Sequence, residues 1–241
     1  QAYAWAGLLN QGMEANDAAL LGLSHIDKFD QDFIDFSIEQ WLLGIRVRLL
    51  IRLVRLEEAR VCLQQMLSTD ERLLDPVIRQ ITHHLHVEFA AVTHNSKMAA
   101  EHADEVLAIA KQHSNPYSKV FSLWSAGVAD ACNENWIAAK INLSDALAHI
   151  STSATAVEFE TEIRASLAEC HLMSGSVDLA LQVATENIAI SSIRNNRVAQ
   201  CRGQIVSAHV LSQRVDAASA AEAQLLLQQA GQLIIVTGAK I

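Results

Sequence analysis

The sequence has few of the residues that build loops and turns. Its 241 residues include two prolines and nine glycines, and aromatic residues make up 5% of the chain. Alternating runs of strand-forming residues between turn residues are also missing, whereas Ala, Leu, Glu, Gln and Ile dominate. With 51% hydrophobic residues, the chain can bury a sizeable core. We therefore predict an all-α fold of long helices joined by short turns.

Charge and hydropathy disfavour several kinds of partner. A net charge of −9 and a pI near 5.5 argue against nucleic acid, because affinity for phosphate backbones comes from Lys and Arg. No apolar run approaches the roughly 18 residues of a membrane span, and the first residues lack the order of a signal peptide. We expect a cytoplasmic protein that binds neither nucleic acid nor a membrane. Because Tyr3 already lies in a helical pattern, we expect residues 1–241 to be one helical-repeat domain from a longer protein.

Cysteine and histidine give no complete metal site. The four cysteines stand far apart in apolar helical stretches, without a C-x-x-C pair: Cys62, Cys132, Cys170 and Cys201. We expect them to be small core residues in a reducing compartment. His83, His84 and His86 cluster on one expected helix, but no second group of ligands completes a tetrahedral site. We expect them to be structural or to line a groove, with a metal site as the less favoured alternative, and we predict no cofactor.

Motifs of known active sites are missing as well. The sequence holds no glycine-rich phosphate loop, no H-E-x-x-H, no G-x-S-x-G and no catalytic cysteine setting. An acidic stretch contains Glu158, Glu160, Glu162 and Glu169, and a solvated helix face explains it more simply than paired catalytic carboxylates do. Because no nucleophile, base and orienting group occur together, we predict no catalytic residue and no enzymatic activity.

A repeat of about 40 residues is the main pattern in the chain. Alanines that follow expected turns recur at separations of 40, 40, 40, 41 and 43 residues: Ala19, Ala59, Ala99, Ala139, Ala180 and Ala223. Four residues after each of these register alanines an apolar residue continues the same helix face, from Leu23 to Leu227. Twelve residues before them stand mostly small or β-branched residues, such as Gly127, which let two helices approach closely. The pattern predicts six helical hairpins.

The register also predicts where the helices lie. We expect helix pairs at 2–11 and 14–29, 32–54 and 56–68, 73–94 and 96–113, 116–133 and 135–150, 154–174 and 176–192, and 195–214 and 217–237. Pro76 and Pro116 fall at helix starts, where Asp70 or Ser114 would cap the helices. Gly12 falls at an expected turn.

The fourth unit carries residues that resemble a known family. Its matching positions are Leu123, Gly127, Trp136, Ala139, Leu143 and Ala146, with Asp130 where an aromatic residue is expected. These residues resemble the tetratricopeptide pattern, although the period of about 40 exceeds the usual 34. Longer units, with phrases such as Ala108-Ile109-Ala110-Lys111 before Asn115-Pro116, resemble the regulatory repeats that follow an ATPase module in large bacterial signalling proteins, including some nucleotide cyclases and transcription activators. The resemblance implies a right-handed solenoid of about six antiparallel helical hairpins.

In such a stack the first helix of each unit lines a concave surface. The register then nominates a partly exposed strip for partner binding, formed by Trp41, Arg48, His84, Glu88, Phe121 and Trp124, with Glu162 and Glu169 further along. Aromatic residues flanked by charges suit a groove for a peptide or helix. The alternative for the tryptophans is packing between helices.

One hairpin also holds a stripe of arginines. They are Arg46, Arg48, Arg52, Arg55 and Arg60. Such a stripe would recognise an acidic segment or a phosphate. The alternative, which we favour, is that these side chains pair with Glu57, Glu58 or neighbouring repeats.

These observations favour a binding module over an enzyme. We expect an interaction scaffold for a protein or peptide, other domains of its parent included, that serves as the regulatory or sensory part of a larger bacterial signalling protein. The alternative is a sensor that binds a small effector molecule in the concave groove and biases the parent between two states.

Overall fold

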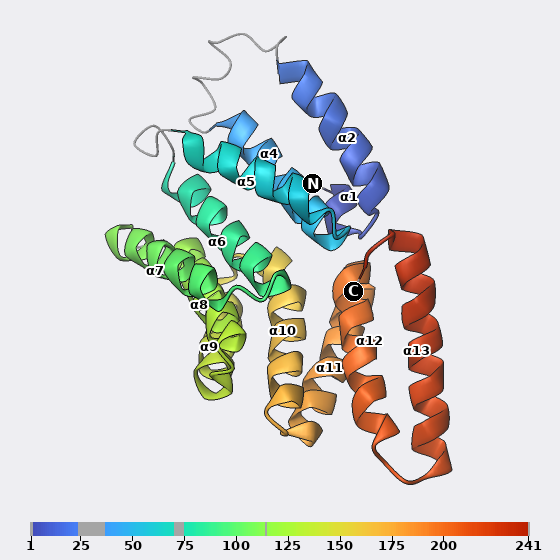
Figure 1. The fold of residues 1–241 in the computed structure, drawn as a ribbon. Helices are drawn as coiled ribbons and strands as arrows, with labels where there is room; N and C mark the ends of the chain where they lie inside the picture. The colour runs from blue at the N-terminus through green and yellow to red at the C-terminus, as the bar shows by residue number, and fades with distance from the viewer. Residues whose placement is uncertain (1, 24–36, 70–74, 114, 241) are drawn as a thin grey trace.

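The computed structural model describes residues 2–23, 37–69, 75–113 and 115–240 (Figure 1). Within these ranges the regular structure is entirely helical, so the prediction of an all-α fold is confirmed. The helices are α1 (Ala2–Trp5), α2 (Leu9–Gly22), α4 (Ile38–Arg52), α5 (Leu56–Ser68), α6 (Pro76–Val92), α7 (Ser96–Gln112), α8 (Pro116–Cys132), α9 (Trp136–Ser153), the 3-10 helix η3 (Val157–Phe159), α10 (Glu160–Met173), α11 (Val177–Ile193), α12 (Arg197–Ser212) and α13 (Ala217–Thr237).

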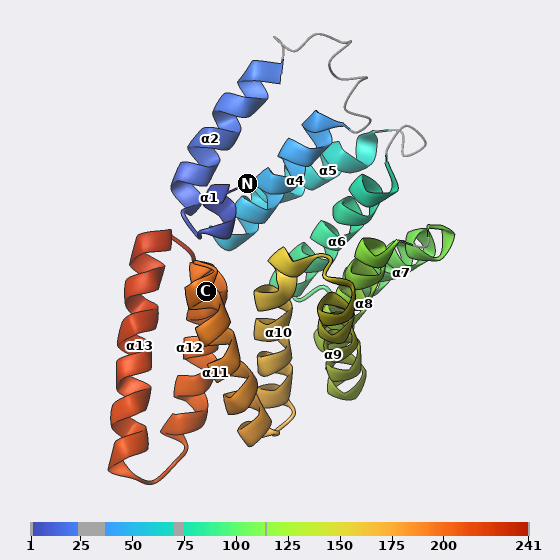
Figure 2. The ribbon, with the colours of Figure 1, turned by 180° about the vertical axis from the view of Figure 1, so that it is seen from behind.

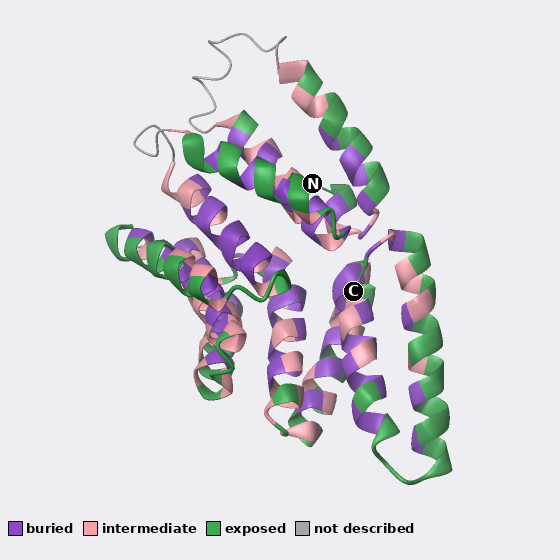
Figure 3. Cartoon of the chain, viewed as in Figure 1, coloured by how far each residue is buried: buried purple, intermediate pink, exposed green. Residues whose placement is uncertain are grey.

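Packing follows the order of the chain. From α4 to α13 each helix contacts the next, and α4, α6, α8, α10 and α12 also contact one another in series. Figure 2 shows the same succession from behind, with α13 on one side of the molecule next to α12. In Figure 3 buried residues run along α10 and α12, whereas α13 exposes most of its outer surface. None of the described helices is both long and apolar enough to cross a membrane.

The repeat register is visible in the burial of the middle helices. Four of the register alanines have no exposed surface, and each is the fourth residue of its helix: Ala59, Ala99, Ala139 and Ala180. The residues twelve positions earlier are buried on the preceding helix. A Cβ atom added at Gly127 would lie 2.7 Å from Cγ of Leu143, which confirms the close approach predicted there. At the ends Ala19 is half-buried and Leu227 is 54% exposed, so the predicted apolar face is wrong at Leu227.

Four helix pairs share one turn geometry. Two residues after the first helix ends, Val54, His94, Glu134 and Gly175 have φ angles of 57°, 54°, 57° and 76°. The next residue donates its N–H to a carbonyl five residues earlier, as Asn95 does to Ala90 at 2.9 Å. This pattern satisfies carbonyls that a helix end leaves free. The turn before α13, residues 213–216, is longer, in line with the spacing of 43 residues in the last unit.

Two expected helix boundaries are wrong. The first turn centres on Gly7, with φ of 69°, rather than on Gly12. Gly12 lies inside α2, and a Cβ atom there would lie 3.0 Å from Cδ2 of Leu49, so its small size serves packing. The expected helix 154–174 begins only at Glu160, because Ala154 and Ala156 have left-handed backbones that interrupt it.

The residues that cap α6 and α8 also differ from the predicted ones. Asp75 and Asn115 stand directly before the prolines that begin α6 and α8, and each side chain accepts the N–H of the second helical residue. The predicted caps Asp70 and Ser114 lie outside the described residues.

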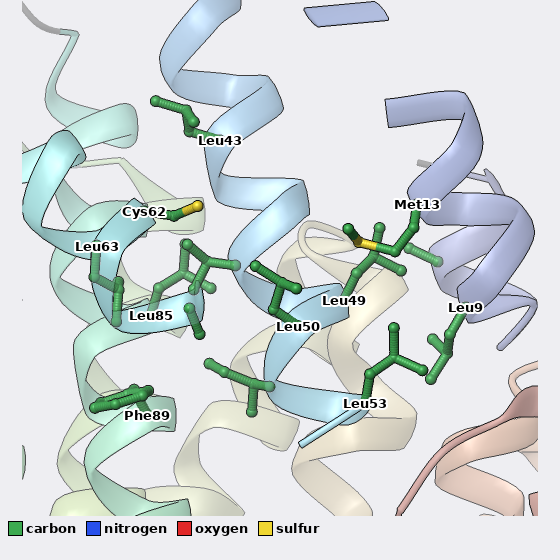
Figure 4. Close-up of a cluster of buried hydrophobic side chains, with 14 of the residues drawn as sticks. Leu9, Met13, Leu43, Leu49, Leu50, Leu53, Cys62, Leu63, Leu85 and Phe89 are labelled. Atoms are coloured by element: carbon green, nitrogen blue, oxygen red, sulfur yellow. The ribbon is translucent and has the colours of Figure 1, made fainter. Parts of the chain in front are cut away.

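One hydrophobic cluster joins both ends of the chain. Figure 4 shows Leu9 and Met13 of α2 facing Leu49 and Leu53 at the end of α4. Ala239, which follows α13, belongs to the same cluster and is 1% exposed. The N–H of Lys240 donates to the carbonyl of Arg52 at 3.0 Å. The segment after α13 therefore packs against the end of α4, early in the chain.

Candidate binding groove

A groove of about 630 Å³ runs past α4, α6, α8, α10 and the beginning of α12. Its lining follows the repeat, because residues eleven and seven positions before the register alanines line it in four successive units. These residues are Arg48, Glu88, Val128 and Glu169, and Arg52, Val92, Cys132 and Met173. Ala239 and Lys240 complete the lining from the segment after α13. The groove is thus lined by equivalent positions of successive repeats.

Three arginine–glutamate pairs lie in the groove wall. They are Arg48 with Glu88, Arg52 with Glu162 and Arg202 with Glu169. Arg48 donates from Nε and Nη2 to the two carboxylate oxygens of Glu88, at 3.2 and 3.3 Å. Arg202 donates to both oxygens of Glu169 at 2.8 and 2.6 Å. Two parallel hydrogen bonds fix both partners in position, so the charges of the wall are balanced within the chain.

Burial and charge act in opposite directions on the Arg48–Glu88 pair. Burial alone would lower the pKa of Arg48, but the carboxylates of Glu88 and Glu162 raise it. Burial likewise favours the neutral form of Glu88, yet the positive charge of Arg48 holds the pKa of this carboxyl well below its usual range. Both groups therefore remain charged at neutral pH.

Aromatic rings surround the guanidinium of Arg48. Its Cζ atom lies 5.7 Å from the ring centre of Trp5, 5.5 Å from that of Trp124 and 5.3 Å from that of Phe159. A cation within about 6 Å of an aromatic face is attracted by the negative charge of that face. The aromatic cage of this protein is therefore filled by one of its own side chains.

The structure brings five of the six nominated residues together. His84 Nδ1 lies 2.8 Å from Ser125 Oγ, and His84 Nε2 lies 3.5 Å from Glu88. The ring centre of His84 lies 5.1 Å from that of Phe121 and 4.1 Å from that of Trp124. Arg48 joins this group through Glu88.

The nominated residues do not form the partly exposed strip that the register predicted. His84, Phe121 and Trp124 have exposures of 0%, 1% and 2%, because their rings pack against each other between α6 and α8. Packing between helices, the alternative, applies to Trp124. Trp41 lines a separate small cavity of about 50 Å³ beside Arg48 and Phe121. Of the six residues, Arg48, Glu88 and Trp124 line the groove.

Pairing within the chain, the favoured interpretation of the arginine stripe, holds for all five arginines. Besides the pairs of Arg48 and Arg52, Arg46 pairs with Asp17, Arg55 with Glu58 and Arg60 with Glu57. The side chain of Arg52 is 11% exposed and that of Arg55 is 44% exposed. Arg52 is therefore largely buried, whereas Arg55 lies at the surface.

The acidic stretch is not the solvated face that we expected. Glu162 is 4% exposed and pairs with Arg52 of α4. Glu160 accepts hydrogen bonds from Arg164 at 2.9 Å and Arg194 at 2.6 Å. Arg164 lies four residues after Glu160 on the same helix. Arg52 and Arg194, however, are distant from their partners in the sequence, so a local pattern could not predict these pairs.

The histidine cluster is packed as a structural group. His83 Nδ1 lies 2.9 Å from His102 Nδ1, and the ring of His86 stacks on that of His102 at 4.1 Å. Burial, together with His86 and His83, lowers the pKa of His102 to about 3. Among the described residues no group of three or more His, Cys, Asp or Glu side chains could hold a metal ion.

The cysteines largely lie where we expected them. Cys62, Cys170 and Cys201 are buried, whereas Cys132 is half-buried and lines the groove. Burial raises the pKa of Cys170 to about 12 and that of Cys201 to about 11, which makes both thiols poor nucleophiles.

Sequence reasoning missed Trp5, Phe159 and Arg202. Trp5 and Phe159 lie outside the regular repeat, in α1 and in the 3-10 helix before α10, so no periodic signal points to them. Glu169, in contrast, occupies the same register position as Arg48 and Glu88, which is why the register found it.

No protein-family model matches the chain, and no curated protein matches it. The chemistry of the groove is therefore the guide to function. Its wall combines internally paired charges with apolar surface from Val92, Val128, Trp136 and Met173. Such a surface can bind a ligand by burying its apolar groups and orienting it with a few polar contacts.

Proposed function

We propose that the chain is a right-handed solenoid of antiparallel, tetratricopeptide-like helical hairpins whose concave groove binds a protein or peptide segment. The observation that carries this proposal is the register of the groove. Positions eleven and seven residues before the alanines of four successive units line it. Stacked repeats produce extended concave surfaces in this way, and such surfaces serve binding.

The shape and lining of the groove favour a peptide. Residues between Arg48 and Lys240 contribute to it from at least five helices, which gives an extended surface. Half-exposed apolar side chains such as Val92 and Met173 offer area that a partner would remove from water. A segment laid along the groove would meet these residues in succession, as an amphipathic helix does in a hydrophobic groove.

We further propose that the groove makes this chain the regulatory module of a larger cytoplasmic signalling protein of bacteria. The resemblance of its long repeats to the segments that follow ATPase modules supports this role. The partner is then a separate protein or another domain of the same polypeptide. Binding would shift the parent between two states if the partner prefers one of them.

A small effector molecule is the second candidate ligand. It is favoured by the groove volume of about 630 Å³. Sites for small molecules usually measure about 300 to 1,000 Å³. The two candidates predict different ligands for the same surface, so one set of variants tests both.

The test uses a phage-displayed library of random 12-residue peptides. We expect the wild-type chain to enrich peptides that no longer bind Ala131→Trp, because Ala131 lines the groove and a large ring there would fill it. Ala148→Trp is the matched control, since Ala148 is exposed on α9 away from the groove. Peptides that bind all three proteins equally would refute a peptide groove. A parallel thermal-shift screen uses nucleotides and amino acids. A rise in melting temperature that is lost in Ala131→Trp but kept in Ala148→Trp would support the small effector molecule.

A further inference from the structure

Three turns between helices place strained residues at the rim of the groove. Val54, His94 and Glu134 occupy the same position in successive repeats, and all three line the groove. Their φ angles are between 54° and 57°, in the left-handed region that glycine adopts most readily. We call these three residues the rim.

The rim residues are costly choices for the backbone. A left-handed conformation is unfavourable for residues with a Cβ atom, and most so for a β-branched residue such as Val54. The fourth equivalent turn uses Gly175, which does not line the groove. Of these four turns, the three that carry a side chain at this position line the groove, and the one with glycine does not. Left-handed residues with a side chain also occur outside the groove, at Ala154, Ala156 and Asn195, so the rim is distinguished by its exposed side chains in the groove.

The polar rim residues are also available to a ligand. His94 and Glu134 are exposed, and within the described chain neither side chain forms an ion pair or a hydrogen bond. Lys240, exposed at the segment after α13, is in the same situation. The arginines and glutamates of the groove wall, in contrast, are paired with each other. Charge selection of a ligand thus falls to the rim and to Lys240.

We propose that the rim and Lys240 select an amphipathic peptide that has a basic residue towards one end and an acidic residue towards the other. Apolar side chains of the peptide pack against Val54, Trp136 and Met173, a basic residue pairs with Glu134, and an acidic residue pairs with Lys240. This inference rests on the proposed function, since it specifies the peptide that the groove binds. Complementary charges suppress wrong partners and fix the register of the right one.

Glycine substitution separates binding from folding at the rim. Because glycine fits the left-handed conformation, Val54→Gly should raise the melting temperature by about 2 to 4 °C. The same change should weaken the peptide enriched from the 12-residue library at least about fivefold, and so should Glu134→Gly, because each removes a contact. Ala154→Gly is the control, since Ala154 is left-handed with φ of 53° but lies outside the groove. It should gain stability without any change in affinity.

Charge-reversal variants test whether Glu134 and Lys240 select opposite charges at the two ends of the peptide. Selection on wild type should enrich Lys and Arg at one end of the peptides and Asp and Glu at the other. Selection on Glu134→Lys should replace the basic residues by acidic ones, and selection on Lys240→Glu should do the reverse at the other end. If wild type enriches no peptide, the proposed function fails. If it enriches peptides that bind the glycine and charge variants with unchanged affinity, the function stands and the rim inference is wrong.

Discussion

In the pairs α6/α7, α8/α9 and α10/α11 both the register alanine and the apolar residue four positions later are buried. At the ends Ala19 is half-buried, and in α13 the register alanine Ala223 is 4% exposed but Leu227, four residues later, is 54% exposed. The middle pairs also share one turn, and the last pair has a longer one. A repeat with neighbours on two sides must keep close helix contacts, while an end repeat is held on one side alone. The difference shows that the register is enforced by packing.

The first and last units are also joined by polar contacts. Arg52 donates to the carbonyl of Ala4 at 3.2 Å and pairs with Glu162 of α10, while its own carbonyl accepts the N–H of Lys240. Arg197 of α12 donates to the carbonyl of Ala6 at 2.7 Å. Polar contacts therefore join the first and last units directly.

The largest effect should come from a charge at the centre of the register. Ala139→Asp should lower the free energy of unfolding by about 3 to 5 kcal/mol, because a carboxylate without a partner would replace a methyl group with no exposed surface. Ala19→Asp, at the equivalent end position, should cost less than about 1 kcal/mol. Urea unfolding measures both. Equal losses would show that the ends are packed like the middle.

Arg52→Ala tests the polar contacts of the ends. It should cost about 3 kcal/mol, since Glu162, 4% exposed, would be left buried without its arginine. Adding Glu162→Gln should restore part of the loss, because the unpaired charge is then removed. Arg55→Ala is the control, and its exposed pair with Glu58 should contribute little to stability because solvent screens it. Thermal and urea unfolding that leave Arg52→Ala and Arg55→Ala alike would contradict the assigned role of Arg52.

Alanine substitutions at two glycines, one in a middle pair and one in the last helix, should change stability in opposite directions. Gly127→Ala should cost about 1 to 3 kcal/mol, because the new Cβ atom would lie 2.7 Å from Cγ of Leu143 and 3.3 Å from the carbonyl oxygen of Ala139. Gly231→Ala in α13 meets no atom within 4 Å and should stabilise the protein by about 0.5 to 1 kcal/mol. If calorimetry finds both substitutions stabilising, the helices of the fourth pair are further apart than described.

The last effect is absent at neutral pH and concerns the stability of the pair α6/α7 in acid. Burial, with the nearby histidines, lowers the pKa of His102 to about 3, and burial also lowers that of His86. The unfolded chain therefore binds more protons below about pH 6.5, so stability present above that pH is lost as the pH falls towards 3. The slope per histidine is at most about 1.4 kcal/mol per pH unit. His102→Gln should flatten the curve of melting temperature against pH, and an unchanged slope would place His102 in water.

The period of the repeat predicted the residues that are buried between neighbouring helices. Ala59, Ala99 and Ala139 were found because burial on one helix face repeats with the turn of the helix. The burial of Arg52 and Glu162 could not be found, since the two are 110 residues apart and only the tertiary fold brings them together. The turns at Val54, His94 and Glu134 lie where the register places them, but their left-handed backbone was not predicted, because they lack the glycine that usually signals it.

The contact of Arg197 with Ala6 spans 191 residues and has a consequence for how the molecule folds. A linear array of repeats frays from its ends, and its folding depends on contacts between neighbours in the sequence. Here the first and last segments meet, so the mean sequence separation of contacts rises, and folding should be slower than in an open array of the same length. Amide hydrogen exchange in α2 and α12 should then report the opening of the whole chain, because neither end can detach without breaking the other.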